Sequence, residues 1–206
     1  ILLLKVERMP TPAELRNRSH DALAQYLAGN EPQTRLLAVR AIGQSRDMDQ
    51  RALVEPLARD VSARGPTDRA IAEEAARSLG LVGAIDSVGT LQALLTGSNA
   101  PTLQLAAASA LAQLQHPRGL DALRQLLSYG DELTKVQSAL VLLDHRDFIG
   151  AASLWAAVTK GRLGEDRRIE VLGRLARSDD DQAKLRLAEE LPRLPSGESR
   201  IKVADR

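Results

Sequence analysis

A short helical pattern recurs along this chain and constrains its fold more than any other feature. Each copy closes on a large aliphatic residue, and small or apolar residues precede it by three and four positions, which places them on one face of a helix. The closing residues, called position 0 below, are Ile42, Leu79, Leu111, Leu142 and Leu175. They lie 37, 32, 31 and 33 residues apart, and a period in this range is typical of stacked helical repeats.

A second helix follows each copy in a matching register, so the repeating unit is a helix pair. Positions +12 and +16 are apolar throughout: Val54, Leu91, Leu123, Leu154 and Leu187, then Ala58, Leu95, Leu127, Val158 and Leu191. Leu23, Tyr26 and Leu27 fit the same pattern ahead of the first copy. We expect helices at about 12–28, 32–43, 48–62, 67–80, 87–96, 101–113, 118–129, 132–143, 148–159, 165–177 and 181–191.

Capping residues support these helix starts. About eleven positions before each closing residue stand side chains that suit a helix N-terminus, where an acceptor satisfies free backbone N–H groups: Glu31, Asp68, Asn99, Asp131 and Glu165. The run Asp179–Asp181 before the last helix suggests either a cation site or a cap, and capping is the stronger interpretation.

Composition excludes several classes of function. Only four residues are aromatic, so the core must consist of Leu, Ala, Val and Ile. The absence of cysteine excludes disulfides and thiolate metal sites, and a net charge of +1 gives no global attraction for a polyanion. No stretch reaches the roughly 18 apolar residues needed to span a bilayer.

The repeated pattern resembles the HEAT repeat, in particular the short HEAT-like repeats of bacterial proteins and phycobilin lyase subunits. The family pattern Val-Arg-x-x-Ala-Ala-x-Ala-Leu-Gly is matched by Arg35, Ala38-Val39 and Ala41-Ile42-Gly43, and again by Ala75-Ala76 and Ser78-Leu79-Gly80. The resemblance covers about residues 12–191. It implies an all-α, right-handed α-solenoid of about five helix pairs, in which the second helix of each repeat lines the concave surface.

This resemblance points to residues that contact a partner on the concave surface. Positions −7 and −2 carry a mildly basic strip, for which the candidates are Arg35, Arg40, Arg77, Gln104, Lys135 and Arg168. The alternative is that these residues link one repeat to carboxylates of the next. The family arginine at −7 is replaced by Ala72 and Gln104, so we expect any ladder of charges to be interrupted in the middle of the array.

Trp155 is the most unusual single residue. It stands at position +13, where other copies carry Glu55, Gln92 and Arg124, and this polar register predicts an exposed aromatic anchor on the convex layer. The alternative is that Trp155 packs against Phe148 or the terminal repeat.

The candidate chemistry for catalysis is weak. His20, His116 and His145 form no metal-binding pair, and neither a nucleophile motif nor a phosphate-binding loop is present. The pair Glu73-Glu74 suggests an exposed acidic spot or simply a solvated pair. We therefore expect no enzymatic activity, no metal and no cofactor.

The sequence favours a non-catalytic protein–protein interaction scaffold or adaptor whose partner is another protein. The alternatives are a nucleic-acid-binding HEAT-like domain, for which the net charge is unfavourable, and a subunit of a lyase-type enzyme. We expect three parts: an extension at 1–11 with strand character or from a preceding segment, the repeats at 12–191, and a tail at 192–206. A cytoplasmic location is expected, with a periplasmic or membrane-attached one as the alternatives.

Overall fold

The computed structural model describes residues 11–59, 65–160, 163–190 and 192. In these ranges the chain forms eleven α-helices, three short 3-10 turns and no strand. The helices are α1 (Pro12–Ala28), α2 (Pro32–Ser45), α3 (Arg51–Arg59), α4 (Pro66–Leu81), α5 (Val88–Gly97), α6 (Pro101–Gln113), α7 (Pro117–Tyr129), α8 (Glu132–Asp144), α9 (Ala151–Thr159), α10 (Glu165–Arg177) and α11 (Asp181–Glu190). The turns η1 (Met48–Gln50), η2 (Ile85–Ser87) and η3 (Phe148–Gly150) precede α3, α5 and α9.

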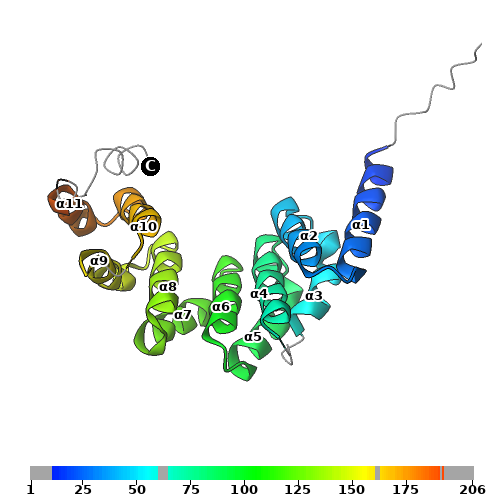
Figure 1. Cartoon of the computed structure of the whole chain (residues 1–206), viewed down its shortest axis with the longest axis horizontal. Helices are drawn as coiled ribbons and strands as arrows, with labels where there is room; N and C mark the ends of the chain where they lie inside the picture. Colours follow the sequence, from blue (N-terminus) through cyan, green and yellow to red (C-terminus); the bar gives the residue numbers. More distant parts are fainter. Residues whose placement is uncertain (1–10, 60–64, 161–162, 191, 193–206) are drawn as a thin grey trace, which may run out of the picture.

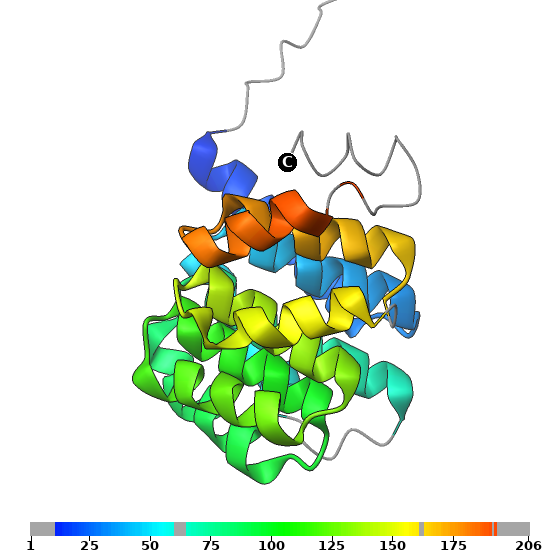
Figure 2. The same ribbon diagram turned by 90° about the vertical axis from the view of Figure 1, so that its left-hand side faces the viewer.

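The helices stack in two layers that curve into a crescent (Figure 1). Helices α2, α4, α6, α8 and α10 line the inner side, while α3, α5, α7, α9 and α11 form the outer layer. Figure 2 faces the C-terminal end of this array, with α10 and α11 in front of the earlier repeats. The predicted all-α solenoid of helix pairs is confirmed. The possible strands near either end, part of the long connector (60–64) and Leu191 lie outside the described residues.

The core follows the predicted register. All five residues at position 0 are fully buried, and so are Val54, Leu91, Leu123 and Leu154 at position +12. Burying one such side chain contributes about 1.5–3 kcal/mol, so these two positions stabilise every repeat.

Local signals begin the helices. A proline occupies the first turn of α2, α4, α6 and α7, where its missing N–H is not needed. Glu31 caps α2 by accepting hydrogen bonds from the backbone of Gln33 and Thr34, and Asp131 caps α8 by accepting one from Thr134 at 2.7 Å. The Thr34 hydroxyl also donates to Glu31, and this bond together with the backbone bonds lowers the pKa of Glu31, while the bond from the Thr134 backbone lowers that of Asp131. The other three predicted caps do not act as caps: Asp68 and Glu165 lie in the first turn of their helices, and Asn99 precedes the capping position of α6, which is Ala100.

The turn inside each of the first four repeats uses a left-handed residue at position +4. The φ angles there are 53° for Arg46, 74° for Gly83, 57° for Gln115 and 60° for Arg146. Each of these residues donates its backbone N–H to the carbonyl three residues earlier, which ends the inner helix. Because only one of the four is a glycine, no residue type marks this turn in every repeat.

The first two steps between neighbouring inner helices depend on closely spaced backbones. A Cβ on Gly43 of α2 would lie 3.0 Å from the Ser78 Cα on α4, and a Cβ on Gly80 of α4 would lie 2.7 Å from the Ala110 Cα on α6. These contacts join position +1 of one helix to position −1 of the next. Ser78 is buried, and its hydroxyl donates to the Val39 carbonyl at 2.9 Å.

Later steps are wider because larger residues occupy the same two positions. Ala112 and Val141 stand there between α6 and α8, and Leu143 and Arg174 stand there between α8 and α10. Contact between successive inner helices is extensive from α2 to α6, smaller between α6 and α8, and smallest between α8 and α10. The side-chain volume at positions +1 and −1 therefore parallels how tightly each repeat packs on the next.

This interpretation predicts opposite effects for two glycine substitutions. Gly80→Ala forces a methyl group against the α6 backbone and should lower the free energy of unfolding by about 1–3 kcal/mol. Gly89→Ala on α5, where a Cβ would meet nothing within 4 Å, should raise it by about 0.5–1 kcal/mol. Urea denaturation followed by circular dichroism measures both, and a stabilising Gly80→Ala would contradict the packing argument.

Candidate protein-interaction surface

An ion ladder crosses the inner side of the N-terminal repeats. Arg40 on α2 contacts Glu74 on α4 at 3.0 Å, and Arg77 lies 3.3 Å from Glu74 and 3.8 Å from Glu73. The Thr102 hydroxyl on α6 then donates to Glu73 at 2.5 Å. The ladder thus joins three successive inner helices.

The interpretation of Glu73-Glu74 as an exposed acidic spot or a solvated pair is wrong. Both side chains are only 16% exposed, because they face the neighbouring helices at positions −6 and −5. The ladder stops at α6, since position −2 is Ser109 on α6 and Leu140 on α8. The interruption was predicted from Ala72 on α4 and Gln104 on α6, but the ladder passes through α4, and its residues stand at −2, −5, −6 and −9 rather than at −7.

The six residues predicted to form one inner strip do not lie on one surface. Positions −7 and −2 are five residues apart, which is about 140° around a helix. Arg40 and Arg77 belong to the ladder, whereas the Gln104 side-chain amide donates to the Ser98 carbonyl at 2.7 Å in the turn before α6. Any partner contact by these residues stays a prediction.

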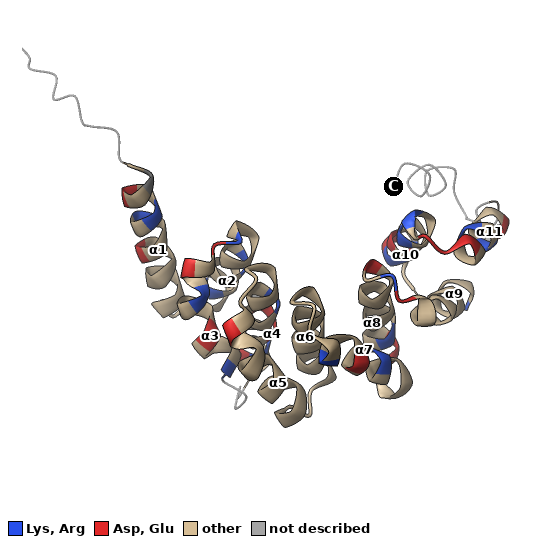
Figure 3. Cartoon of the chain, turned by 180° about the vertical axis from the view of Figure 1, so that it is seen from behind, with Lys and Arg blue, Asp and Glu red and all other residues tan. Residues whose placement is uncertain are grey.

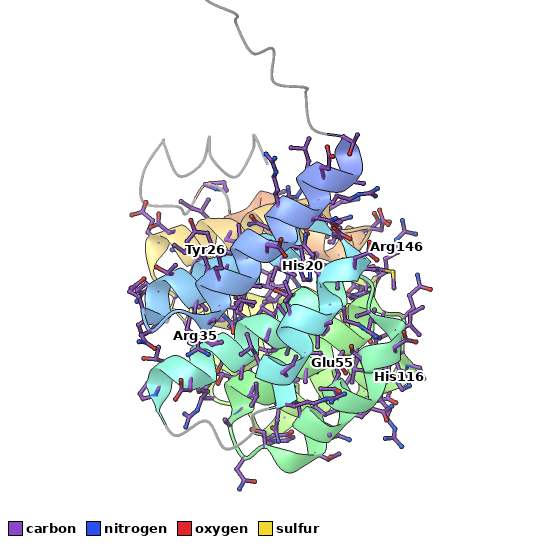
Figure 4. All side chains as sticks on the ribbon, turned by 90° about the vertical axis from the view of Figure 1, so that its right-hand side faces the viewer. His20, Tyr26, Arg35, Glu55, His116 and Arg146 are labelled. Atoms are coloured by element: carbon purple, nitrogen blue, oxygen red, sulfur yellow. The ribbon has the colours of Figure 1, made fainter. Side chains whose placement is uncertain are left out.

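The other three strip residues are half-buried cations at position −7. Arg35, near the start of α2 (Figure 4), Lys135 and Arg168 make no ion pair with the described residues. The Nε atoms of Arg35 and Arg168 are buried without a hydrogen-bond partner there. They therefore do not supply the links between repeats that the alternative interpretation required.

Trp155 is not an exposed anchor. Its side chain is 5% exposed and belongs to a buried cluster that includes Val158, Leu172 and Leu187. Phe148 lies outside this cluster and is partly exposed. Of the two alternatives weighed for Trp155, packing into the terminal repeats is the observed one.

Exposure of Trp155 was predicted because position +13 is polar in other repeats. The prediction failed because those polar residues contact the next repeat rather than the solvent. Gln92 contacts His116 at 3.2 Å, and Arg124 forms an ion pair with Asp147 at 2.7 Å. This contact raises the pKa of Arg124. Each of these residues joins its outer helix to the next repeat, so Trp155 occupies the last of a series of joints.

Glu55 forms the first of these outer joints. Glu55 lies on α3 (Figure 4). It accepts hydrogen bonds from the Thr90 hydroxyl on α5 at 2.9 Å and from Arg59 at 2.8 Å, and Arg51 lies 3.8 Å away. Burial raises the pKa of Glu55, but the hydrogen bonds from Thr90 and Arg59 and the nearby arginine charges outweigh it. The pKa therefore lies below its ordinary value of 4.5.

The inner surface also exposes leucines between its charges. Leu37 on α2 is 60% exposed and shares its register with Glu74, while Leu133 on α8 is 42% exposed and shares its register with Thr102. Because Glu74 and Thr102 take part in the inner ladder, these leucines lie on the same side of the array.

Charge on the inner surface is mixed. Helix α6 carries no charged residue and α2 carries only Arg35 and Arg40, but α4, α8 and α10 each carry acidic and basic residues, so the charges do not form one basic patch (Figure 3). The basic members are Arg40, Arg77, Arg174 and Arg177, and the acidic members are Glu73, Glu74, Asp144, Asp166 and Glu170. Such a surface lacks the continuous positive charge that contacts to phosphate groups require.

The three histidines are distributed over separate elements: His20 is on α1, and His116 and His145 stand at helix ends (Figure 4 for the first two). Within the described ranges, no three His, Asp or Glu side chains gather in a way that could hold a metal ion. In the same ranges no helix is long and apolar enough to cross a membrane.

The fold and its inner surface define an α-solenoid of stacked helix pairs. Comparison with known families is consistent with this class and makes it more specific. Residues 62–143, which run from just before α4 into α8, match the family described as HEAT repeats. This part of the chain belongs to the HEAT-repeat family, and the helix pairs on either side continue the same array. The predicted HEAT resemblance is therefore confirmed.

HEAT repeats generally mediate protein interactions and are typically non-enzymatic. No curated protein matches this chain in sequence.

The contacts of Glu55 predict that the free energy of unfolding depends on pH. The folded-state pKa of Glu55 is depressed, so its contribution is fully present above about pH 4.5 and is lost as the pH falls through the folded-state value. Glu55→Gln should cost roughly 1–3 kcal/mol at neutral pH, and this difference from wild type should shrink below pH 4.5. Urea unfolding between neutral and acidic pH measures it, and parallel stability curves would contradict the assignment.

Proposed function

We propose that this protein is a non-catalytic scaffold or adaptor that binds another protein through the inner surface of its solenoid. The observation that carries the proposal is the placement of Leu37 and Leu133 as exposed apolar side chains among charges of both signs. Apolar anchors surrounded by polar groups are the arrangement that concentrates binding energy in protein interfaces. The two-layer array would hold these anchors in place, since their helices pack on buried neighbours.

A protein partner fits the inner surface better than a nucleic acid does. Glu73 and Glu74 neutralise Arg40 and Arg77, so these arginines are already engaged when a partner arrives. Binding a phosphate backbone would require breaking those pairs and bringing phosphate next to carboxylates. A protein surface with charges of both signs meets no such repulsion.

The proposal predicts that substitutions on the inner surface abolish a specific interaction. Proteins captured from the source cells by the wild-type chain are identified, and the most enriched one is purified for affinity measurement by calorimetry. Leu37→Glu/Leu133→Glu should weaken this affinity at least about ten-fold, because each change places an unpaired carboxylate in the contact. The single variants then assign the loss to either half of the array.

A matched control uses the outer layer. Leu185 on α11 is 67% exposed, so Leu185→Glu makes the same chemical change away from the inner surface and should leave the affinity unchanged. Loss of the partner with Leu185→Glu alone would refute the proposal. So would tight binding of duplex DNA that falls steeply with added salt, because that result would favour nucleic-acid binding.

A further inference from the structure

A groove runs along the inner side of α10, next to α8. Three hollows of about 510, 460 and 400 Å³ follow one another there. The first and second share Asp166 and Arg167, and the second and third share Arg174 and Arg177. The hollows therefore join into one groove from the first turn of α10 to the last.

The groove lies where the inner helices no longer pack tightly. Between α4 and α6 the same place is filled by the contact of Gly80 with Ala110, but between α8 and α10 it carries Leu143 and Arg174. Leu143 is buried in the C-terminal core, and Arg174 pairs with Asp144 on α8. Both large side chains are thus fixed in position, and the separation of α8 from α10 is built into the fold.

The two ends of the groove differ in charge. At the start of α10 the lining includes the carboxylates of Glu132, Glu165 and Asp166 with one guanidinium, that of Arg167. At the other end it includes three guanidinium groups and two carboxylates: Arg146, Arg174, Arg177, Asp144 and Asp179.

Two exposed charges mark this polarity. Arg146 pairs with Asp179 at 3.4 Å and Arg174 pairs with Asp144, which leaves Arg177 without an ion pair to a described residue. Asp166 at the opposite end likewise has none. Apolar side chains accompany both ends, with Leu133 and Leu163 at the acidic end and Phe148 at the basic end.

We propose that this groove binds an α-helix of a protein partner that carries basic residues near one end and acidic residues near the other. Helix α10 has 13 residues and is about 20 Å long, so the bound helix would have about four turns. A helix suits the groove because α10 lines its whole length and α8 lines both of its ends, so that the side chains of a bound helix can pack against them as ridges in grooves. The inference rests on the proposed function and assigns the inner-surface contact to its C-terminal half.

A library of displayed helical peptides of about four turns, with charges randomised, tests the proposal on the full chain. Selected peptides should have basic residues at one end and acidic residues at the other. Asp166→Lys and Arg177→Glu should each weaken their binding about ten-fold, because each change brings like charges together. Arg186→Glu, the same kind of change on α11, should leave binding unchanged. Circular dichroism melting of each variant confirms that the fold is retained.

The outcomes separate the two proposals. Peptides without charge polarity, or peptides that bind Asp166→Lys and Arg177→Glu as tightly as wild type, would overturn the groove assignment. If those peptides instead lose affinity with Leu37→Glu, the inner surface still binds proteins and only the groove is wrong. The library is first shown to yield binders to another helix-binding protein. Both proposals fail if it then yields none for this protein and if the Leu37→Glu/Leu133→Glu variant binds cellular partners as tightly as wild type.

Discussion

The close approach of successive inner helices is the constraint on which the rest of this structure depends. At positions +1 and −1, glycine, alanine and serine let α2, α4 and α6 pack backbone against backbone. Ile42, Leu79 and Leu111 are completely buried beside these contacts. An apolar side chain contributes its full share of stability only where neighbours fill the space around it, so the small residues and the large ones act together. Where larger residues replace the small ones, at Leu143 and Arg174, the helices separate.

In the outer layer, side chains of several chemical types connect each helix to the next repeat. Position +13 joins each outer helix to the next repeat through a carboxylate in Glu55, an amide in Gln92, a guanidinium in Arg124 and an indole in Trp155. Partly exposed ion pairs contribute little net stability, about 0–1 kcal/mol each. The buried Trp155 lies at the step where contact between successive inner helices is smallest.

The sequence predicted the helices well because their signals are local. The apolar stripe, the prolines of the first turns and caps such as Asp131 all act within one helix. It did not predict which registers face the neighbouring repeat. Glu73 and Glu74 look solvated, and position +13 looks exposed, because polarity alone does not distinguish a side chain in water from one that bridges two repeats. The left-handed turns at Arg46, Gln115 and Arg146 lacked a glycine to mark them. A relation between repeats thus has no local signature. The predicted inner strip fails for a different reason, which lies within one helix: positions −7 and −2 point about 140° apart.

These differences divide the inner surface into two halves with different capacities for binding. In the N-terminal half, the charges of Arg40, Arg77 and Glu74 already satisfy one another, so a partner must compete with pairs that exist. In the C-terminal half, Asp166 and Arg177 have no ion pair with the described residues and flank a space that is already open. A preformed site loses little conformational freedom on binding. The tight repeats therefore act as a frame that fixes the array, and the step with the poorest internal packing is the one best prepared for a ligand. The proposed binding site is thus formed by the same residues, Leu143 and Arg174, that stand where the inner helices are in least contact.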